Sequence, residues 1–272
     1  MKTRRTPRKI QLRKWIAEEC LRINIPEKES FEKKIRGKKV AVVIPSSSLL
    51  KNAQGKNIDN NYNTVIRIGH GYETDGLEDY LGTKTDAIYH GLRKGRGIKR
   101  LNLNLVESYG VKHICCLCSQ SIFWRCKANE RRAKKRNIQI DFVYRNPIET
   151  TLWNFCKNFK KTKPSFRPLQ GVAAIADIIT ADPKDLTICG ADFYDTLYQP
   201  NYDSRARKLR YKQTKETAQR FHNLQRNRVY TSELILSRPN IFIDQPTFQA
   251  LLRNKYIRRR LKEKLKERVV EI

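Results

Sequence analysis

Two of the four histidines in this 272-residue chain are candidates for acid–base chemistry. The ordinary pKa of histidine is about 6.5, so a neutral imidazole can accept a proton near neutral pH. His222 stands at the start of a helix predicted over 221–237 and is the preferred general base. His70 is the alternative. The other two follow or lie in predicted strands, where we expect packing roles: His90 and His113.

The segment 186–202 places small, acidic and aromatic residues after a predicted strand. Leu186–Cys189 is short and fully apolar, which is typical of a buried parallel strand. Open α/β sheets bind ligands at the carboxyl ends of such strands. Phenol hydroxyls at this edge can stabilise a phosphate as negative charge develops, or the rings can simply pack the loop. The residues concerned are Gly190, Asp192, Tyr194, Tyr198 and Tyr202.

Apolar runs along the chain predict the elements that must position these side chains. Helical patterns are expected over Leu12–Ile23, Thr150–Lys161, the small-residue run after Gly171, 221–237 and 247 to about 270. The segment 125–136 is expected to be a basic connection and 204–215 a mobile lid. Short apolar runs predict strands at Lys39–Ile44, Thr64–Ile68, Ala87–Tyr89, Lys112–Leu117, Ile138–Tyr144, Leu186–Cys189 and Ile241–Ile243.

This alternation of strands and helices predicts a single α/β domain with a mainly parallel sheet flanked by helices. We divide the chain into a basic, peripheral N-terminal extension (1–38), an α/β domain (39–246), to which the family resemblance described below assigns nucleotide-sugar binding, and a basic amphipathic C-terminal helix (247–272).

The formal net charge is +30, which predicts an anionic partner: a nucleic acid, a lipid surface or a phosphorylated donor. In the C-terminal stretch 253–268, apolar residues recur at helical spacing between basic ones. Such a helix can lie on an anionic membrane, and the same apolar stripe could equally dock on the sheet. Nucleic acid is the less favoured partner because the basic runs lack interleaved aromatic residues.

The seven cysteines are an odd number, and several lie in apolar strand-like runs, which predicts reduced packing thiols in a reducing compartment. Cys115 and Cys118 have a zinc-ligand spacing, but a strand points them to opposite faces and no second pair follows. An Asp-x-Asp pair is a common way to hold a metal ion together with a nucleotide diphosphate. The chain lacks such a pair, so we predict no bound metal. It also lacks a signal peptide or apolar membrane span, so we predict a cytoplasmic protein.

Three stretches together resemble the sialyltransferases of glycosyltransferase families 29 and 42, over roughly Lys39 to Ile243. The first holds Ile58-Asp59, Val65-Ile66-Arg67 and Gly82-Thr83-Lys84-Thr85 in the family's order. The second holds Arg167, the helix after Gly171, and Gly190-x-Asp192-Phe193-Tyr194. The third is Phe221-His222-Asn223-Leu224-Gln225-Arg226, with Asn227 where many family members have Glu.

The resemblance implies a Rossmann-like fold of the glycosyltransferase-A variant and an inverting transferase. Eukaryotic members usually carry a membrane anchor, and its absence here predicts a bacterial or viral type of protein. It would move sialic acid or a related keto-sugar from a CMP donor to a glycan acceptor, without a cofactor. His222 would be the base, and Tyr194 with Tyr198 or Tyr202 would stabilise the leaving phosphate. The donor-binding residues would be Ser46, Ser48, Arg67, Arg167, Gln170, Gly171, Gly190 and Asp192.

Three departures from the family pattern stand out. Pro45 and Gly69 stand where the family has asparagines, and Leu169 and Gln170 stand where it has Ser or Thr before the helix glycine. These departures leave open a different donor sugar, or a non-catalytic protein that binds nucleic acid or another anion on the same fold.

Overall fold

The computed structural model describes residues 25–92, 101–117, 120–145, 168–202, 215–216, 219 and 222–272. They build one seven-stranded sheet in the order β5-β4-β3-β2-β1-β6-β7, and all neighbouring strands are parallel. The predicted α/β fold class is therefore confirmed. The strands are β1 (Lys39–Val43), β2 (Thr64–Ile68), β3 (Ala87–Tyr89), β4 (His113–Leu117), β5 (Asp141–Arg145), β6 (Asp185–Cys189) and β7 (Ile241–Ile243).

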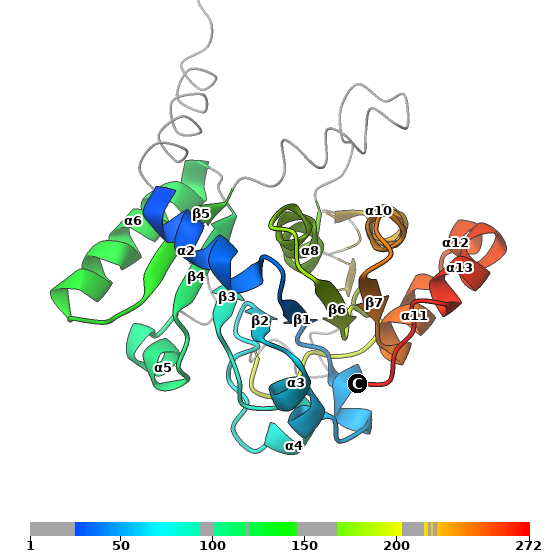
Figure 1. The fold of residues 1–272 in the computed structure, drawn as a ribbon, viewed down its shortest axis with the longest axis horizontal. Coiled ribbons are helices and arrows are strands. Elements are labelled where there is room, and N and C mark those ends of the chain that lie inside the picture. The colour runs from blue at the N-terminus through cyan, green and yellow to red at the C-terminus, as the bar shows by residue number, and fades with distance from the viewer. Residues whose placement is uncertain are drawn as a thin grey trace, which may run out of the picture.

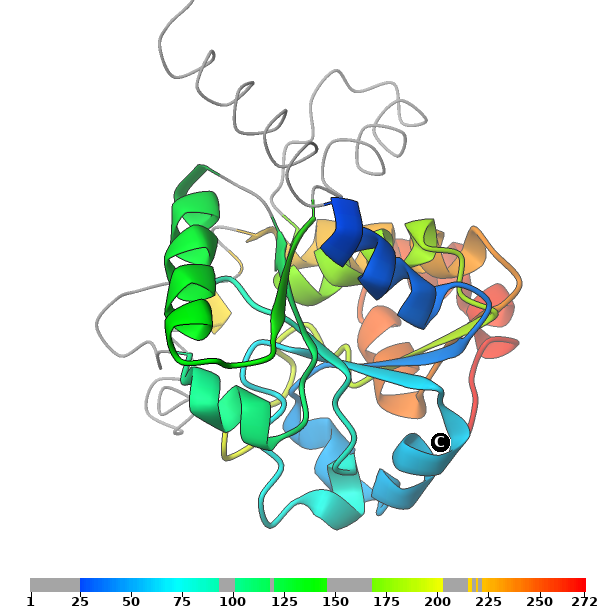
Figure 2. The same ribbon diagram turned by 60° about the vertical axis from the view of Figure 1, so that its left-hand side comes forward.

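Helices cover both faces of this sheet. One face carries α2, α8 and α10, and the other carries α3, α4 and α5 (Figures 1 and 2). The helices described are α2 (Ile25–Ile35), η1 (Ser47–Lys51), α3 (Gly55–Asn61), α4 (Glu78–Leu81), α5 (Leu103–Ser108), α6 (Gln120–Lys135), α8 (Gln170–Thr180), α10 (Leu224–Leu236), α11 (Gln245–Leu251), α12 (Lys255–Arg260) and α13 (Lys262–Lys266).

Strand β1 shows why the central strands are apolar throughout. Val40 and Val42 join the core cluster that includes residues of α2, α8 and α10, whereas Ala41 and Val43 join the cluster on the α3 and α4 side. Successive side chains of a strand point to opposite faces, so a strand covered on both sides needs apolar residues at every position. The run Lys39–Ile44 meets this requirement from sequence alone.

The strand order creates a topological switch point between β1 and β6. From β1 the chain adds β2 to β5 outward on one side, and it then returns to place β6 and β7 on the other side. In open α/β sheets, the crevice at the carboxyl ends of two such strands is the usual ligand site. The segments that follow β1 and β6 are therefore the first place to look for function.

The N-terminal extension is not wholly peripheral, because its last third forms α2. Phe31 and Ile35 are four positions apart on one face of this helix, and both are fully buried in the main core. Other elements also differ from the predictions. The basic stretch 125–136 lies almost entirely within helix α6, β5 begins at Asp141, and α10 begins at Leu224. Helices α3, α4 and α5 were not predicted.

The predicted single C-terminal helix is wrong, since the chain forms α11, α12 and α13 there. Asn254 lies between α11 and α12 and caps the amino end of α12. Its side chain accepts hydrogen bonds from the backbone N–H groups of Tyr256 and Ile257. The apolar stripe survives the breaks, and Leu251, Ile257 and Leu265 are fully buried in the main core. Of the two alternatives, the stripe therefore faces inward and packs into the main core, where α12 and α13 contact α10.

Several predicted features lie outside the described residues. They are the helices Leu12–Ile23 and Thr150–Lys161, Arg167, Cys118, and the lid segment apart from Lys215. Within the described ranges, no helix combines the length and the apolar character needed to cross a membrane.

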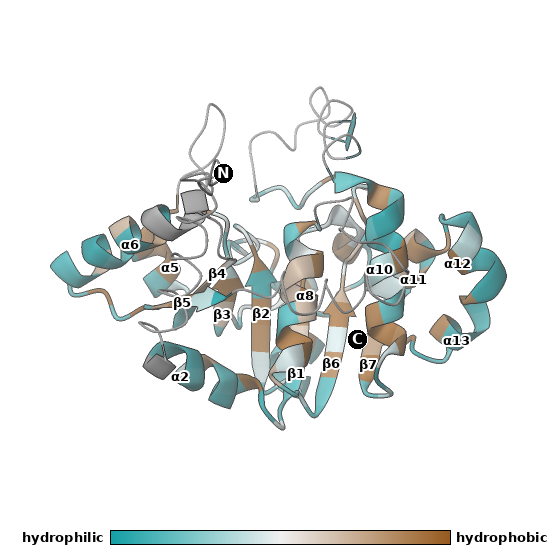
Figure 3. Ribbon diagram, turned by 90° about the horizontal axis from the view of Figure 1, so that it is seen from above, coloured by the Kyte–Doolittle hydropathy of each residue, from teal (hydrophilic) through white to brown (hydrophobic). Residues whose placement is uncertain are grey.

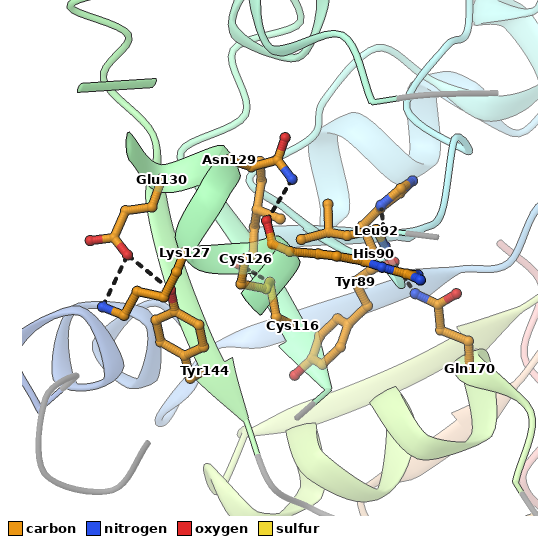
Figure 4. The surroundings of a disulfide bond; sticks show 12 residues. Tyr89, His90, Leu92, Cys116, Cys126, Lys127, Asn129, Glu130, Tyr144 and Gln170 are labelled. Atoms are coloured by element: carbon orange, nitrogen blue, oxygen red, sulfur yellow. Dashed lines mark hydrogen bonds and ion pairs between the residues drawn. A yellow bond between two sulfur atoms is a disulfide. The ribbon is translucent and has the colours of Figure 1, made fainter. Parts of the chain in front are cut away.

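Cys116 in β4 and Cys126 in α6 form a disulfide, which corrects the expectation of reduced thiols for this pair (Figure 4). Both residues are fully buried, as are the free thiols Cys115 and Cys189. Helix α6 follows β4 directly and folds back on the sheet face to which Cys116 points. The sequence could not show this pairing, because it depends on where the helix crosses the strand.

We expect peptide mapping under non-reducing conditions to recover the Cys116–Cys126 linkage. Closing a loop of this length stabilises a protein by about 3 kcal/mol, so reduction should lower the free energy of unfolding by about that amount. A Cys126→Ala variant should match the reduced protein and gain no stability on oxidation. Recovery of both peptides with free thiols would contradict the pairing.

Candidate active site

The turn after β1 and the turn after β6 are joined at the switch point through Asp192. Its carboxylate accepts hydrogen bonds from Ser46 Oγ at 2.7 Å, Thr196 N at 3.0 Å, Tyr194 N at 3.1 Å and Thr196 Oγ1. Ser46 Oγ also lies 2.7 Å from Ser48 Oγ. Burial raises the pKa of Asp192, although these hydrogen bonds act in the opposite direction. The cluster fixes the start of the tyrosine loop (residues 192–202).

Gly190 occupies a position that only glycine fits, between β6 and this cluster. Its φ is +73°, and a Cβ there would lie 2.8 Å from the carbonyl oxygen of Ile44. Gly171, at the start of α8, likewise lets the helix approach closely, since a Cβ would lie 2.9 Å from Ile44 Cδ1. The two predicted donor-site glycines thus bring α8 and the turn after β6 against the end of β1.

Two residues that the sequence did not single out accept hydrogen bonds from the backbone of the Gly190 turn. Asp244 Oδ2 accepts from Gly190 N at 2.7 Å, and Thr247 Oγ1 accepts from Ala191 N at 2.9 Å. Asp244 also caps α11, and burial raises its pKa to about 6. An aspartate before Gln-Pro-Thr is a recognisable helix start, and this signal could have identified the cap.

The three predicted tyrosines gather over the carboxyl end of β2. The rings of Tyr198 and Tyr202 stack at 4.4 Å, and Tyr194 meets Tyr198 edge to face at 5.6 Å. Tyr202 lies against Gly69, where a Cβ would be 2.9 Å from ring atom Cε2. Gly69 therefore leaves room for this ring, and any side chain at position 69 would require the ring to move.

The turn that carries Tyr194 has an unusual backbone. Phe193 and Tyr194 have φ values of +53° and +64°, in the left-handed region that L-residues with a Cβ rarely adopt. Each such residue costs about 1–2 kcal/mol. The hydrogen bond from Tyr194 N to Asp192 and the packing of Phe193 hold the turn in this form.

His70 and His90 form a hydrogen-bonded chain beside the tyrosine loop. Leu92 N donates to His90 Nδ1 at 2.9 Å, so the His90 proton belongs on Nε2, which faces His70 Nε2 at 3.4 Å. His70 Nδ1 is then the donor to Glu73 Oε1 at 3.2 Å. Both nitrogens of His70 are engaged, and this makes it a poor alternative base. His90 is a buried packing residue, as predicted.

Burial and, secondarily, the proximity of His70 lower the pKa of His90 to about 3. The unfolded chain binds this proton below about pH 6.5, whereas the folded chain does not. Stability should therefore be complete above pH 6.5 and fall by about 1.4 kcal/mol per pH unit as the pH drops towards 3. We expect urea titrations to show a shallower acid slope for His90→Asn, which keeps an acceptor for Leu92 N. Identical slopes would contradict this.

His222 lies at the amino end of α10, and its segment is tied to the start of α8. Fully buried Asn227 donates through Nδ2 to the His222 carbonyl and accepts through Oδ1 from Leu169 N at 2.8 Å. The next residue, Gln170, donates to the Tyr89 carbonyl at 2.7 Å (Figure 4). Asn227 stood out in the sequence only as a departure from Glu. Here it connects the His222 segment with α8.

Arg228 joins α10 to the tyrosine loop and was not predicted as a site residue. Its Nη2 donates to Asp195 Oδ2 at 2.9 Å, its Nε donates to the Ala250 carbonyl at 2.9 Å, and its guanidinium lies 5.3 Å from the Phe193 ring centre. Arg228 is almost fully buried. The helix that begins after His222 and the loop that carries Tyr194 are consequently fixed relative to each other.

Arg67, an expected donor-binding residue, has hydrogen-bond partners within the chain. Its side chain is fully buried on the α4 face of the sheet and donates to Thr85 Oγ1 at 2.9 Å and to the Leu81 carbonyl at 2.7 Å. Burial lowers its pKa to about 10, and Nη1 has no hydrogen-bond partner among the described residues. The structure gives Arg67 a role in holding the segment 81–85, and contact with a nucleotide stays a prediction.

No group of three or more His, Cys, Asp and Glu side chains in the described ranges could hold a metal ion, and metal independence stays a prediction. A cavity of about 800 Å³ lies at the opposite, amino edge of the strands and includes none of the predicted site residues. Its lining is Glu29, Ser30, Lys33, Lys34, Lys38, Asn63 and Thr64.

No family model matches the chain, and no curated protein matches it. Among solved structures, the chain is similar to a mammalian sialyltransferase in complex with Gal-beta-1-3GalNAc-ortho-nitrophenol. The two chains are 12% identical, the similarity covers 69% of this chain and 68% of the other, and the TM-score is 0.44. At this distance the likeness says nothing about individual side chains, so the site stands on its own geometry.

Proposed function

We propose that this protein is an inverting, sialyltransferase-like glycosyltransferase that moves sialic acid or a related keto-sugar from a CMP donor to a glycan hydroxyl. One observation carries the proposal. The Ser46 turn, the tyrosine loop and the His222 segment are far apart in sequence, and direct contacts link them at the carboxyl edge of the sheet through Asp192, Asn227 and Arg228. The tyrosine loop and the His222 segment hold residues of the second and third stretches of the sequence resemblance, and the Ser46 turn holds two of the expected donor-binding residues.

In the proposed reaction, residues of these segments act as the base and as hydrogen-bond donors to the phosphate. The imidazole of His222 removes the proton from the acceptor hydroxyl, and the oxygen attacks the anomeric carbon of the donor. The bond from that carbon to the phosphate oxygen breaks, and CMP departs with the electron pair. Hydrogen bonds from the phenols of Tyr194 and Tyr198 strengthen as charge develops on the phosphate. Attack opposite to the leaving group inverts the configuration.

Tyr202 supports a donor site that differs in detail from the family pattern. A side chain at position 69 would collide with its ring, so the family's asparagine could be accommodated there only if the Tyr202 ring moved. We therefore assign Tyr202 the donor-facing position that the asparagine would otherwise occupy. An aromatic ring offers stacking where an amide offers hydrogen bonds, so the preferred donor sugar should differ accordingly.

The test is a thermal-shift screen of CMP, UMP, GMP and the corresponding diphosphates, each with Mg²⁺ and with EDTA. We expect CMP to raise Tm by about 5 °C or more at about a hundred times its Kd, equally in both conditions. A response to diphosphates that requires Mg²⁺ would contradict the proposal. Transfer from CMP-linked sialic acid to a galactose-terminated acceptor, followed by mass spectrometry, tests the reaction itself.

The net charge of +30 favours a second candidate, a non-catalytic protein that binds nucleic acid or another polyanion on this fold. Oligonucleotide binding with a steep salt dependence, unchanged in His222→Ala and accompanied by no response to CMP, would establish this alternative instead.

A further inference from the structure

The two last helices present a concentrated positive surface at one end of the molecule. We call it the C-terminal basic face and define it as the exposed side chains Arg258, Arg259, Arg260, Lys262, Lys264 and Lys266. Between 258 and 266 the only acidic residue is Glu263, 3.9 Å from Lys262 Nζ. None of the described acidic residues forms an ion pair with the three arginines. Their charges therefore remain available to an anionic partner.

The apolar side of these helices is already occupied. Ile257 and Leu265 are fully buried in the main core, and Leu261 packs against it. Figure 3 shows the resulting hydrophilic colouring along α12. On α12 and α13, the exposed large hydrophobic side chain is Tyr256, with 47% of its surface accessible to solvent. The face can attract an anionic surface, but it has no apolar stripe left to insert into one.

The geometry of the face favours a lipid surface over nucleic acid. Helices of six and five residues are too short to fill a major groove, which other proteins read with a longer recognition helix or a β-ribbon. Binding of single strands relies on successive stacking aromatics, and the face has one, Tyr256. A membrane demands only clustered positive charge, and tyrosine is enriched at membrane interfaces.

The face has a fixed relation to the switch-point site. Arg253, between α11 and α12, lies 3.1 Å through Nε from Asp195 Oδ2 on the tyrosine loop, and α10 packs against both α12 and α13. A surface bound at the face would therefore hold the carboxyl edge of the sheet in one orientation.

We propose that the C-terminal basic face binds anionic membrane surfaces by electrostatic attraction, without insertion. The inference does not depend on the proposed transferase activity, because it rests only on the charge and packing of α12 and α13.

Helix α6 supplies a matched control, since it carries an equivalent exposed basic cluster at the opposite end of the sheet (Figure 1). The test variant is Arg258→Gln/Arg259→Gln/Arg260→Gln, and the control is Arg131→Gln/Arg132→Gln/Lys135→Gln. Each triple variant removes three exposed positive charges, so both lower the net charge of the protein from +30 by the same amount. Circular dichroism and urea unfolding confirm that each remains folded.

Binding is measured by co-sedimentation with vesicles of phosphatidylcholine alone, or of equal parts phosphatidylcholine and phosphatidylglycerol. We expect binding to the anionic vesicles only, release by high salt, and an affinity lower by about a hundredfold in the α12 variant, given about 1 kcal/mol per basic residue. The α6 control should stay within a few-fold of the parent.

Equal losses in both triple variants would overturn the inference, because the whole charge of the molecule would then be responsible. Absence of parental binding to anionic vesicles would also overturn it. So would a single-stranded or duplex oligonucleotide that binds more tightly than the vesicles and loses affinity selectively in the α12 variant, since the face would then serve nucleic acid.

Discussion

Replacing His222 by alanine should reduce sugar transfer by about two to four orders of magnitude, the usual contribution of one general base. The hydrogen bond that ties this segment to Asn227 uses the His222 carbonyl, which the substitution keeps. We therefore expect CMP affinity and Tm to stay near the parental values. Single-turnover transfer from CMP-linked sialic acid across pH 5 to 9 is the measurement, and the parental acid limb should be absent in the variant.

The matched comparison is His70→Gln, because both nitrogens of His70 already have partners within the chain. Parental transfer by His222→Ala together with a large loss in the His70 variant would reverse the two roles. If both variants and the parent bind CMP but none transfers sugar, the departures at Pro45 and Gly69 become the explanation, and the fold has kept binding without chemistry.

The largest loss of stability should follow from Asp177→Asn in α8. One carboxylate oxygen of Asp177 accepts from Arg145 Nε and from the Tyr89 hydroxyl, both at 2.6 Å, and all three side chains are almost fully buried. The asparagine amide lacks the negative charge of the Asp177 carboxylate. The remaining acidic partner of Arg145 is then Glu32, whose Oε1 lies 2.9 Å from Arg145 Nη1. Removing one partner of a buried ion pair lowers the free energy of unfolding by about 3–5 kcal/mol, because the other charge stays buried without it.

Asp182→Asn is the control for this prediction. Asp182 pairs with Arg238 at 2.6 Å, but its side chain is 72% exposed, so the expected change is below about 1 kcal/mol. Urea unfolding of both variants should give clearly different midpoints. Equal midpoints would mean that the Asp177 contacts contribute no more than a surface pair.

Much of the scaffold follows from local sequence. The strand Thr64–Ile68 was predicted with the bounds that the structure shows, and the small-residue helix after Gly171 corresponds to α8. A continuous apolar run or a helical repeat is specified by neighbouring residues, and burial on both faces follows from it. The same local patterns place Gly190, Asp192 and the tyrosines after a strand and His222 before a helix.

The partners within the site were decided only by tertiary structure. Asp192 is satisfied by Ser46 and its own loop, Arg67 turns to the α4 face, and Asp244 supports Gly190 from another strand. The contacts of Asp192 with Ser46 and of Asp244 with Gly190 join segments far apart in the chain, so no spacing in the sequence encodes them.

The C-terminal region and the disulfide show the same division. The sequence determined that the stretch after 247 has an apolar stripe and a basic side, but only packing against the core decided that the stripe faces inward and the charges face solvent. The sequence also determined that Cys116 lies in an apolar strand. Its disulfide partner, Cys126, depends on where α6 crosses β4. Local patterns fix which residues are buried, whereas the crossing of elements fixes what they meet.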